Sequence, residues 1–137
     1  MALYQRTVLV VEDELLIRLA LADTLEDAGY QVLEAANVLE AVAVLGSERA
    51  IDAVITDVDM PGGLNGFDLM KLINTCYKNT AVIVTSGGHT PDKADLPDGY
   101  EFIAKPCRPA HMLERLEAQL SRRDLASSCT GDRLRAC

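Results

Sequence analysis

The stretch TVLVVEDELL, Thr7 to Leu16, joins an unbroken apolar run to two adjacent carboxylates, Glu12 and Asp13. A run of β-branched and aliphatic residues without polar alternation is typical of a parallel strand that is buried on both faces. Adjacent like charges at the end of such a strand are unfavourable unless a cation lies between them or water solvates them. The stretch therefore predicts an α/β fold and raises the question of what the acidic pair binds.

Apolar runs alternate with helix-periodic segments along the chain. The apolar runs predict five strands, at Thr7–Val11, Gln31–Ala35, Ile51–Thr56, Ala81–Thr85 and Glu101–Ala104. Helices are predicted where apolar residues recur every three or four positions. These segments are Ile17, Ala20, Leu21, Thr24, Leu25 and Ala28 ahead of Gly29; Val38, Ala41, Val42 and Leu45 ahead of Gly46; Phe67 to Thr75; and Pro109 to Leu120. The alternation predicts a three-layer α/β sandwich, with helices on both faces of a five-stranded parallel sheet.

Two segments depart from this alternation. Two prolines and three glycines lie between Gly87 and Gly99, and they predict that the fourth helix is short or irregular. The apolar periodicity is lost beyond Arg122. We therefore expect one domain over residues 1–122 and a disordered tail over residues 123–137.

The composition excludes several classes of protein. The formal net charge of −8 argues against a nucleic-acid surface, which would need a clustered basic face. No window approaches the roughly 18 consecutive apolar residues of a membrane span, and the N-terminus lacks a secretion-signal pattern. We therefore expect a cytoplasmic protein that binds neither nucleic acid nor a membrane.

Polar side chains gather at the predicted carboxyl ends of the strands, where the loops of a parallel α/β sheet converge on ligands. They are Glu12 and Asp13 after the first strand, Asp57 after the third, Thr85 and Ser86 at the fourth, and Lys105 after the fifth. Three carboxylates in one crevice would repel one another unless they share a hard cation such as Mg²⁺. A lysine and a hydroxyl beside them would suit a transferred phosphoryl group. The sequence therefore predicts a Mg²⁺ site at which a carboxylate accepts phosphate.

Four motifs, VVEDE, VITDVDMPG, VTSGG and FIAKP, follow one another at these strand ends and resemble the receiver domain of two-component response regulators. The resemblance covers about Thr7 to Leu120 and implies a flavodoxin-like, doubly wound (βα)5 fold. It implies a phosphorelay protein rather than an enzyme, in which Asp57 takes a phosphoryl group from a phosphohistidine of a histidine kinase or histidine phosphotransferase protein. With no output domain in this chain, we expect the signal to pass to a downstream protein target by contact. Whether phosphorylation drives homodimerisation is left open.

The resemblance also implies which residues bind the metal. Asp13 and Asp57 would bind Mg²⁺ directly. The backbone carbonyl of Asp59 would be the third protein ligand, and Glu12 would act through water. Taken alone, an acidic pair after a strand would more often be solvated loop charges, and only its coincidence with the other motifs favours a site.

The remaining implied roles concern the phosphoryl group. Lys105 would pair with it, and Pro106 would set the backbone that aims the lysine inward, often through a cis bond. Thr85 and Ser86 point to opposite faces of a strand, and only one can face the phosphoryl group. The family places a small residue after this hydroxyl, which favours Ser86 and leaves Thr85 as the alternative. Ser86 and Phe102 would then form a conformational switch, unless Phe102 is simply a core aromatic residue.

Two other classes of protein compete with this interpretation. The DVD motif at Asp57 to Asp59 also opens the haloacid-dehalogenase-like phosphatases, in which the first Asp is phosphorylated and the second is the general acid. That family places the motif on its first strand and generally needs a longer chain. A flavodoxin-like nucleotide binder would need a glycine- or hydroxyl-rich loop where this chain has EDE. The loop MPGGLNG is one residue longer than the commoner receiver form, which could change how a partner approaches Asp57.

Overall fold

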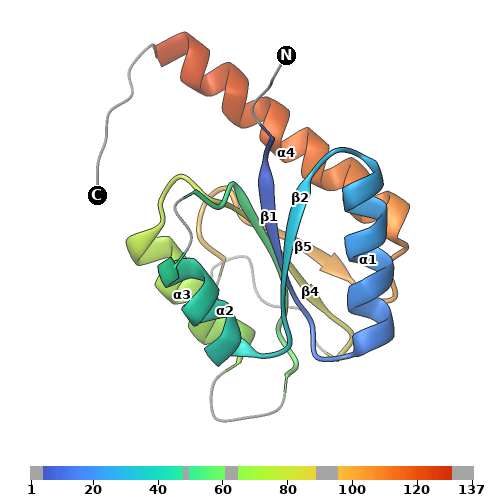
Figure 1. Cartoon of the computed structure of the whole chain (residues 1–137). Coiled ribbons are helices and arrows are strands. Elements are labelled where there is room, and N and C mark those ends of the chain that lie inside the picture. The colour runs from blue at the N-terminus through green and yellow to red at the C-terminus, as the bar shows by residue number, and fades with distance from the viewer. Residues whose placement is uncertain (1–4, 48–49, 61–64, 89–95, 131–137) are drawn as a thin grey trace.

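The computed structural model of the chain describes residues 5–47, 50–60, 65–88 and 96–130. The elements in chain order are β1 (Thr7–Val11), α1 (Leu15–Asp27), β2 (Gln31–Ala35), α2 (Val38–Ser47), β3 (Ala53–Asp57), α3 (Gly66–Cys76), β4 (Ala81–Ser86), β5 (Glu101–Ala104) and α4 (Pro109–Thr130). The five strands form one parallel sheet in the order β2-β1-β3-β4-β5. Helices α1 and α4 cover one face of the sheet, and α2 and α3 cover the other (Figure 1). The predicted three-layer, flavodoxin-like fold is therefore confirmed.

Each face of the sheet has its own hydrophobic core. Strands β1, β3 and β4 are buried along their whole length, as their unbroken apolar sequences predict. On one face, Leu25 of α1 and Leu116 of α4 are fully buried against alternate strand residues. On the other face, Leu69 and Ile73 of α3 are fully buried. Burial of one such leucine or isoleucine stabilises the folded state by about 2 kcal/mol. The two cores thus hold the strands, and the loops that follow them, in place.

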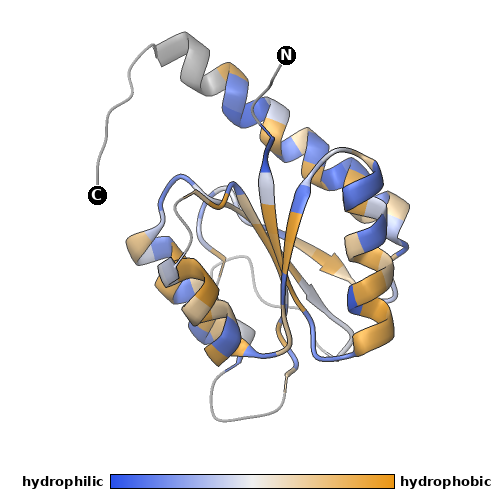
Figure 2. Cartoon of the chain, viewed as in Figure 1, coloured by the Kyte–Doolittle hydropathy of each residue, from blue (hydrophilic) through white to orange (hydrophobic). Residues whose placement is uncertain are grey.

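The buried face of α1 differs from the predicted one. Leu21 and Leu25 are buried as expected, but Ile17 is 43% exposed, and Ala20 and Ala28 are exposed. The first two turns of α1 are strongly apolar (Figure 2), yet Leu16, Ile17 and Ala20 border an open groove. Periodicity identified the helix correctly, but it cannot tell packing against a sheet from the lining of a groove.

The last helix continues beyond the predicted domain boundary. Helix α4 runs to Thr130, past the predicted boundary at residue 122, and the division into a domain and a disordered tail stays a prediction. Two contacts hold this extension against the domain: Arg6 Nη2 pairs with Asp124 at 2.5 Å, and Arg123 Nη2 donates to the backbone oxygen of Thr80 at 3.3 Å. Neither contact follows from apolar periodicity. Residues 131–137 lie outside the described part of the chain.

The link between β4 and β5 is described only at its two ends. Residues 87–88 and 96–100 contain no helix, while residues 89–95, on which the prediction of a short or irregular fourth helix mainly falls, lie outside the described ranges. Among the helices within those ranges, none is both long enough and apolar enough to cross a membrane.

Candidate functional site

The carboxyl ends of β1, β3, β4 and β5 meet at one edge of the sheet, at the lower end of the strands in Figure 1. Glu12, Asp13 and Asp57 come together there, with carboxylate oxygens that all lie within 4.8 Å of one another. Glu12 is 5% exposed and Asp57 is 3% exposed, while Asp13 faces solvent. Buried carboxylates at this spacing repel one another and provide the hard oxygen ligands that Mg²⁺ prefers. The donor set therefore fits the predicted metal.

Lys105 supplies the positive charge that balances the buried carboxylates. Its Nζ lies 2.9 Å from Glu12 Oε1 and 3.0 Å from Asp57 Oδ2. The chain enters this position from β5, and the Lys105–Pro106 peptide bond is cis. The lysine thus bridges the carboxylate after β1 and the carboxylate that ends β3.

Burial and this ion pairing shift two pKa values. Burial raises the pKa of Glu12 above its usual value, although the hydrogen bond from Lys105 opposes the shift. Burial alone would lower the pKa of Lys105, but its hydrogen bonds and charge interactions with Glu12 and Asp57 raise it overall. Lys105 is therefore a stable cation at neutral pH, suited to hold anionic oxygens rather than to donate a proton.

Backbone N–H groups orient the two buried carboxylates. The N–H of Glu14 donates to Glu12 Oε2 at 3.1 Å, and the N–H of Asp59 donates to Asp57 Oδ1 at 3.1 Å. Helix α3 begins at Gly66, whose N–H donates to the carbonyl oxygen of Val58. Residues 61–64 of the long MPGGLNG loop lie outside the described residues, so its effect on a partner stays a prediction.

The two candidate hydroxyls lie on different faces of β4. Thr85 pairs with Asp57 across neighbouring strands, which puts both side chains on the same face. Thr85 also lines the cavity that contains Asp57 and Lys105. Ser86 points to the opposite face and donates its hydroxyl to Asp59 Oδ2 at 2.7 Å. The Thr85 hydroxyl donates to the backbone carbonyl of Thr56 at 3.5 Å. The choice of Ser86 over Thr85 as the hydroxyl that faces the phosphoryl group stays a prediction.

Phe102 lies on β5 beside Val84 of β4, which is two residues before Ser86 and on the same face. Its ring is half-buried and packs against the core under α2 and α3. This position agrees with a core aromatic residue and leaves the predicted switch role untested.

A mainly apolar groove, not predicted from the sequence, opens beside the acidic cluster. It has a volume of about 630 Å³ and lies between the first turns of α1 and the start of α4. Leu16 and Ile17 line one wall and Met112 lines the other, while Asp57 and Lys105 lie along its boundary. The sequence signal that could have indicated this groove is the run of apolar residues at the start of α1, where Leu16 is 79% exposed.

Comparisons with known proteins agree with this geometry. A family model described as "Response regulator receiver domain" matches residues 8–117. The sensory/regulatory protein RpfC of Xanthomonas campestris pv. campestris (strain 8004) is 35% identical over 133 residues, which cover 89% of this chain and 18% of RpfC. The phosphate regulon transcriptional regulatory protein PhoB of Pseudomonas aeruginosa is 34% identical over 122 residues, covering 85% of this chain and 52% of PhoB. The chain thus spans about half or less of the length of these two relatives.

Among solved structures, the chemotaxis response regulator CheY4 of Vibrio cholerae superposes on this chain with a TM-score of 0.74. The two chains are 32% identical, and the match covers 85% of this chain and 99% of CheY4. The sequence and structure comparisons therefore indicate the same family.

Proposed function

Because the chain belongs to the response regulator receiver domain family, we propose that it is a phosphorelay acceptor in which Asp57 takes a phosphoryl group from a phosphohistidine. The observation that carries this proposal is the position of Lys105, whose ammonium group lies within 3.0 Å of the Asp57 carboxylate inside a cluster of three acidic residues. A buried carboxylate that is paired with a cation and adjacent to ligands for Mg²⁺ is suited to attack phosphorus.

The transfer proceeds by displacement at phosphorus. A carboxylate oxygen of Asp57 forms a bond to phosphorus while the bond from phosphorus to the donor's imidazole nitrogen breaks, and that nitrogen keeps the electron pair. Before transfer, Lys105 pairs with the carboxylate of Asp57. After transfer, it pairs with the negatively charged phosphoryl oxygens. Transfer converts the carboxylate to an acyl phosphate and adds negative charge to the crevice.

The charge of the phosphoryl group favours a bound divalent cation. Asp13, Asp57 and the backbone carbonyl of Asp59 would hold Mg²⁺, with Glu12 acting through water. When bound, the metal supplies positive charge that offsets the repulsion between the phosphoryl oxygens and the carboxylates. The chain's own part is to keep these oxygens together, and the N–H groups of Glu14 and Asp59 do so.

A hydroxyl at the end of β4 donates a hydrogen bond to the phosphoryl group. Ser86, on the same face of the sheet as Phe102, supplies this hydroxyl in our proposal, and Thr85, on the face of Asp57, is the alternative. Movement of β4 towards the phosphoryl group would then change the space around Phe102, which pairs with the neighbouring strand residue Val84. The readout passes to another protein by contact at this surface.

The apolar groove gives the phosphohistidine donor a place to dock. It runs from the exposed Leu16 and Ile17 of α1 to Asp57, so an apolar helix of the donor lying in it would bring its histidine to the carboxylate. Leu16→Asp should slow transfer from a histidine-phosphorylated donor protein but leave phosphorylation by acetyl phosphate unchanged. Leu39→Asp is the matched control, because Leu39 is 72% exposed on α2, on the other face of the sheet.

The phosphatase alternative is not favoured. A general acid at Asp59 would have to face the group leaving Asp57, but its carboxylate accepts the hydroxyl of Ser86 instead. The family match also covers the chain from the first strand, where a phosphatase of that class would carry its DxD motif.

Intact-mass measurement after incubation with Mg²⁺ and acetyl phosphate tests the proposal. Wild type should gain one phosphoryl group of about 80 Da, and Asp57→Asn should gain none. Equal labelling of both proteins would remove Asp57 as the acceptor, and steady hydrolysis of a phosphate ester without an adduct would restore the phosphatase alternative.

A further inference from the structure

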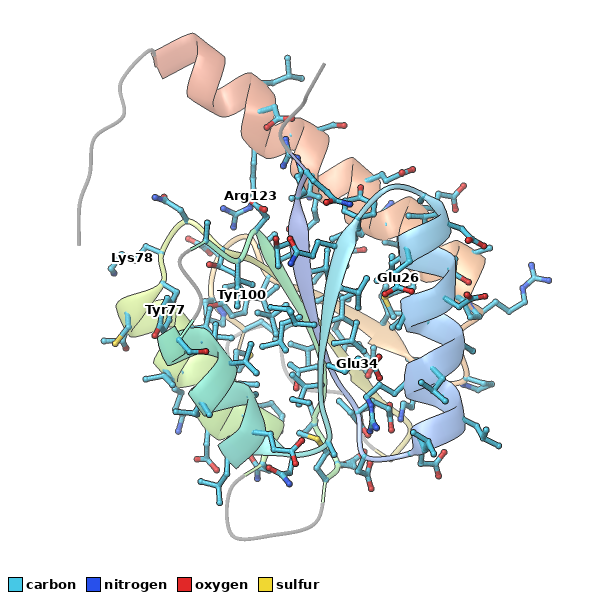
Figure 3. The ribbon with its side chains drawn as sticks, viewed as in Figure 1. Glu26, Glu34, Tyr77, Lys78, Tyr100 and Arg123 are labelled. Atoms are coloured by element: carbon cyan, nitrogen blue, oxygen red, sulfur yellow. The ribbon has the colours of Figure 1, made fainter. Side chains whose placement is uncertain are left out.

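Arg18 of α1 connects the acidic loop to the edge strand of the sheet. Its side chain is only 15% exposed, and it makes two contacts at once. Nη1 donates to the backbone carbonyl of Glu12 at 2.8 Å, and Nε pairs with Glu34 Oε1 at 2.9 Å. Glu34 belongs to β2 and lies on the side of the sheet that α1 covers (Figure 3).

The carbonyl of Glu12 lies where the chain leaves the sheet. Strand β1 ends at Val11, and the N–H of Glu12 makes a last bond to the carbonyl of Ala35 at 3.0 Å. Beyond it, Glu14 takes the N-cap position of α1 without a side-chain cap. A buried backbone carbonyl needs a partner, and the guanidinium of Arg18 supplies one at the residue between the strand and Asp13.

We propose that Arg18 is a positioning residue for the metal site. It fixes the backbone of Glu12, and thereby the direction of the carboxylates of Glu12 and Asp13. The inference rests on the proposed function, because these carboxylates matter as ligands. The planar guanidinium fork suits this task, since it donates to the carbonyl and to Glu34 in one fixed plane, which a lysine cannot do.

A positioning role and a simple charge effect predict opposite changes in Mg²⁺ affinity. Arg18 is a cation next to an acidic cluster, so by charge alone its removal would make the site more negative and tighten Mg²⁺ binding. If its task is positioning, its removal loosens the ligands and weakens binding. Removing a group that hydrogen-bonds to a metal ligand and orients it typically weakens metal binding by about tenfold or more.

Isothermal titration with MgCl₂ on the metal-free full chain separates these effects. Arg18→Gln should weaken Mg²⁺ binding by about tenfold, and Arg18→Lys should recover part of the loss because lysine can still reach the carbonyl. Arg115→Gln is the matched control: Arg115 Nε pairs with Glu101 Oε2 at 2.6 Å, but this ion pair lies between α4 and β5 and makes no contact with the acidic loop in the described residues. The control should bind Mg²⁺ as wild type does.

Amide hydrogen exchange on the metal-free proteins gives a second readout. The N–H groups of Asp13 and Glu14 should exchange faster in Arg18→Gln than in wild type and remain unchanged in Arg115→Gln. Unchanged or tighter Mg²⁺ binding by a folded Arg18→Gln would overturn the inference while leaving the proposed function intact. Absence of Mg²⁺ binding by wild type would instead contradict the proposed function itself.

Discussion

Replacement of Gly66 by alanine tests how closely α3 approaches the end of β3. A Cβ built on Gly66 would lie 2.5 Å from the carbonyl oxygen of Asp57 and 2.7 Å from Cα of Val58. The first distance is about 0.9 Å short of ordinary van der Waals contact, and both neighbours are backbone atoms that cannot rotate away. Overpacking of this kind costs typically about 1–3 kcal/mol, and the gain in helix propensity offsets at most about 1 kcal/mol. We therefore expect Gly66→Ala to lower the free energy of unfolding by about 1–2 kcal/mol.

Urea denaturation measures this loss, and Gly46→Ala is the matched control. Gly46 is also helical, but its Cβ would meet no atom within 4 Å, so alanine should stabilise the protein by about 0.5–1 kcal/mol. Gly66→Ala should also slow the labelling of Asp57 by acetyl phosphate, because the strand end must move to admit the methyl group. Equal stability of Gly66→Ala and wild type, with unchanged labelling, would refute the close approach.

Three further changes give measurable outcomes. Lys105→Met leaves two buried carboxylates without their cation and should lower the free energy of unfolding of the metal-free protein by about 3 kcal/mol in urea titrations. Mg²⁺ should partly restore this stability, and no loss in the variant would mean that the ion pairs do not stabilise the site. Ser86→Ala should weaken binding of beryllofluoride, a phosphoryl mimic, by about tenfold in calorimetry, whereas Thr85→Val should have less effect. The reverse order would assign the phosphate contact to Thr85. Tyr100→Phe should raise the free energy of unfolding by about 1 kcal/mol, because among the described residues the buried hydroxyl of Tyr100 has no hydrogen-bond partner. Burial raises the pKa of Tyr100 from 10.0 to about 12, so wild-type stability that is present below pH 10 should be lost as the pH rises through 12, and the loss should be smaller in Tyr100→Phe.

The sheet was predictable from sequence because buried parallel strands have a strong local signature. The bounds of β1, β2 and β5 agree with the predicted ranges. Strand β3 spans Ala53–Asp57 rather than Ile51–Thr56, and β4 ends at Ser86 rather than Thr85. The convergence of Glu12, Asp57 and Lys105 followed from topology, since parallel strands place their carboxyl ends together.

What the sequence did not predict depends on register and on contacts between distant segments. The face of Thr85 became clear only from its pairing with Asp57. The groove beside α1 needs the relative position of α1 and α4, and the role of Arg18 needs β2 to lie beside the acidic loop. No single helix or strand carries these signals.

The central claim is that Asp57 becomes an acyl phosphate when Mg²⁺ and a phosphodonor are present. Borohydride reduces an acyl phosphate on aspartate to homoserine, and peptide mass spectrometry then locates the modified residue. The account predicts homoserine at position 57 in wild type, only with both donor and Mg²⁺, and none in Asp57→Asn. Homoserine at Asp13 or Asp59, or its absence from a folded wild type that binds Mg²⁺, would contradict it.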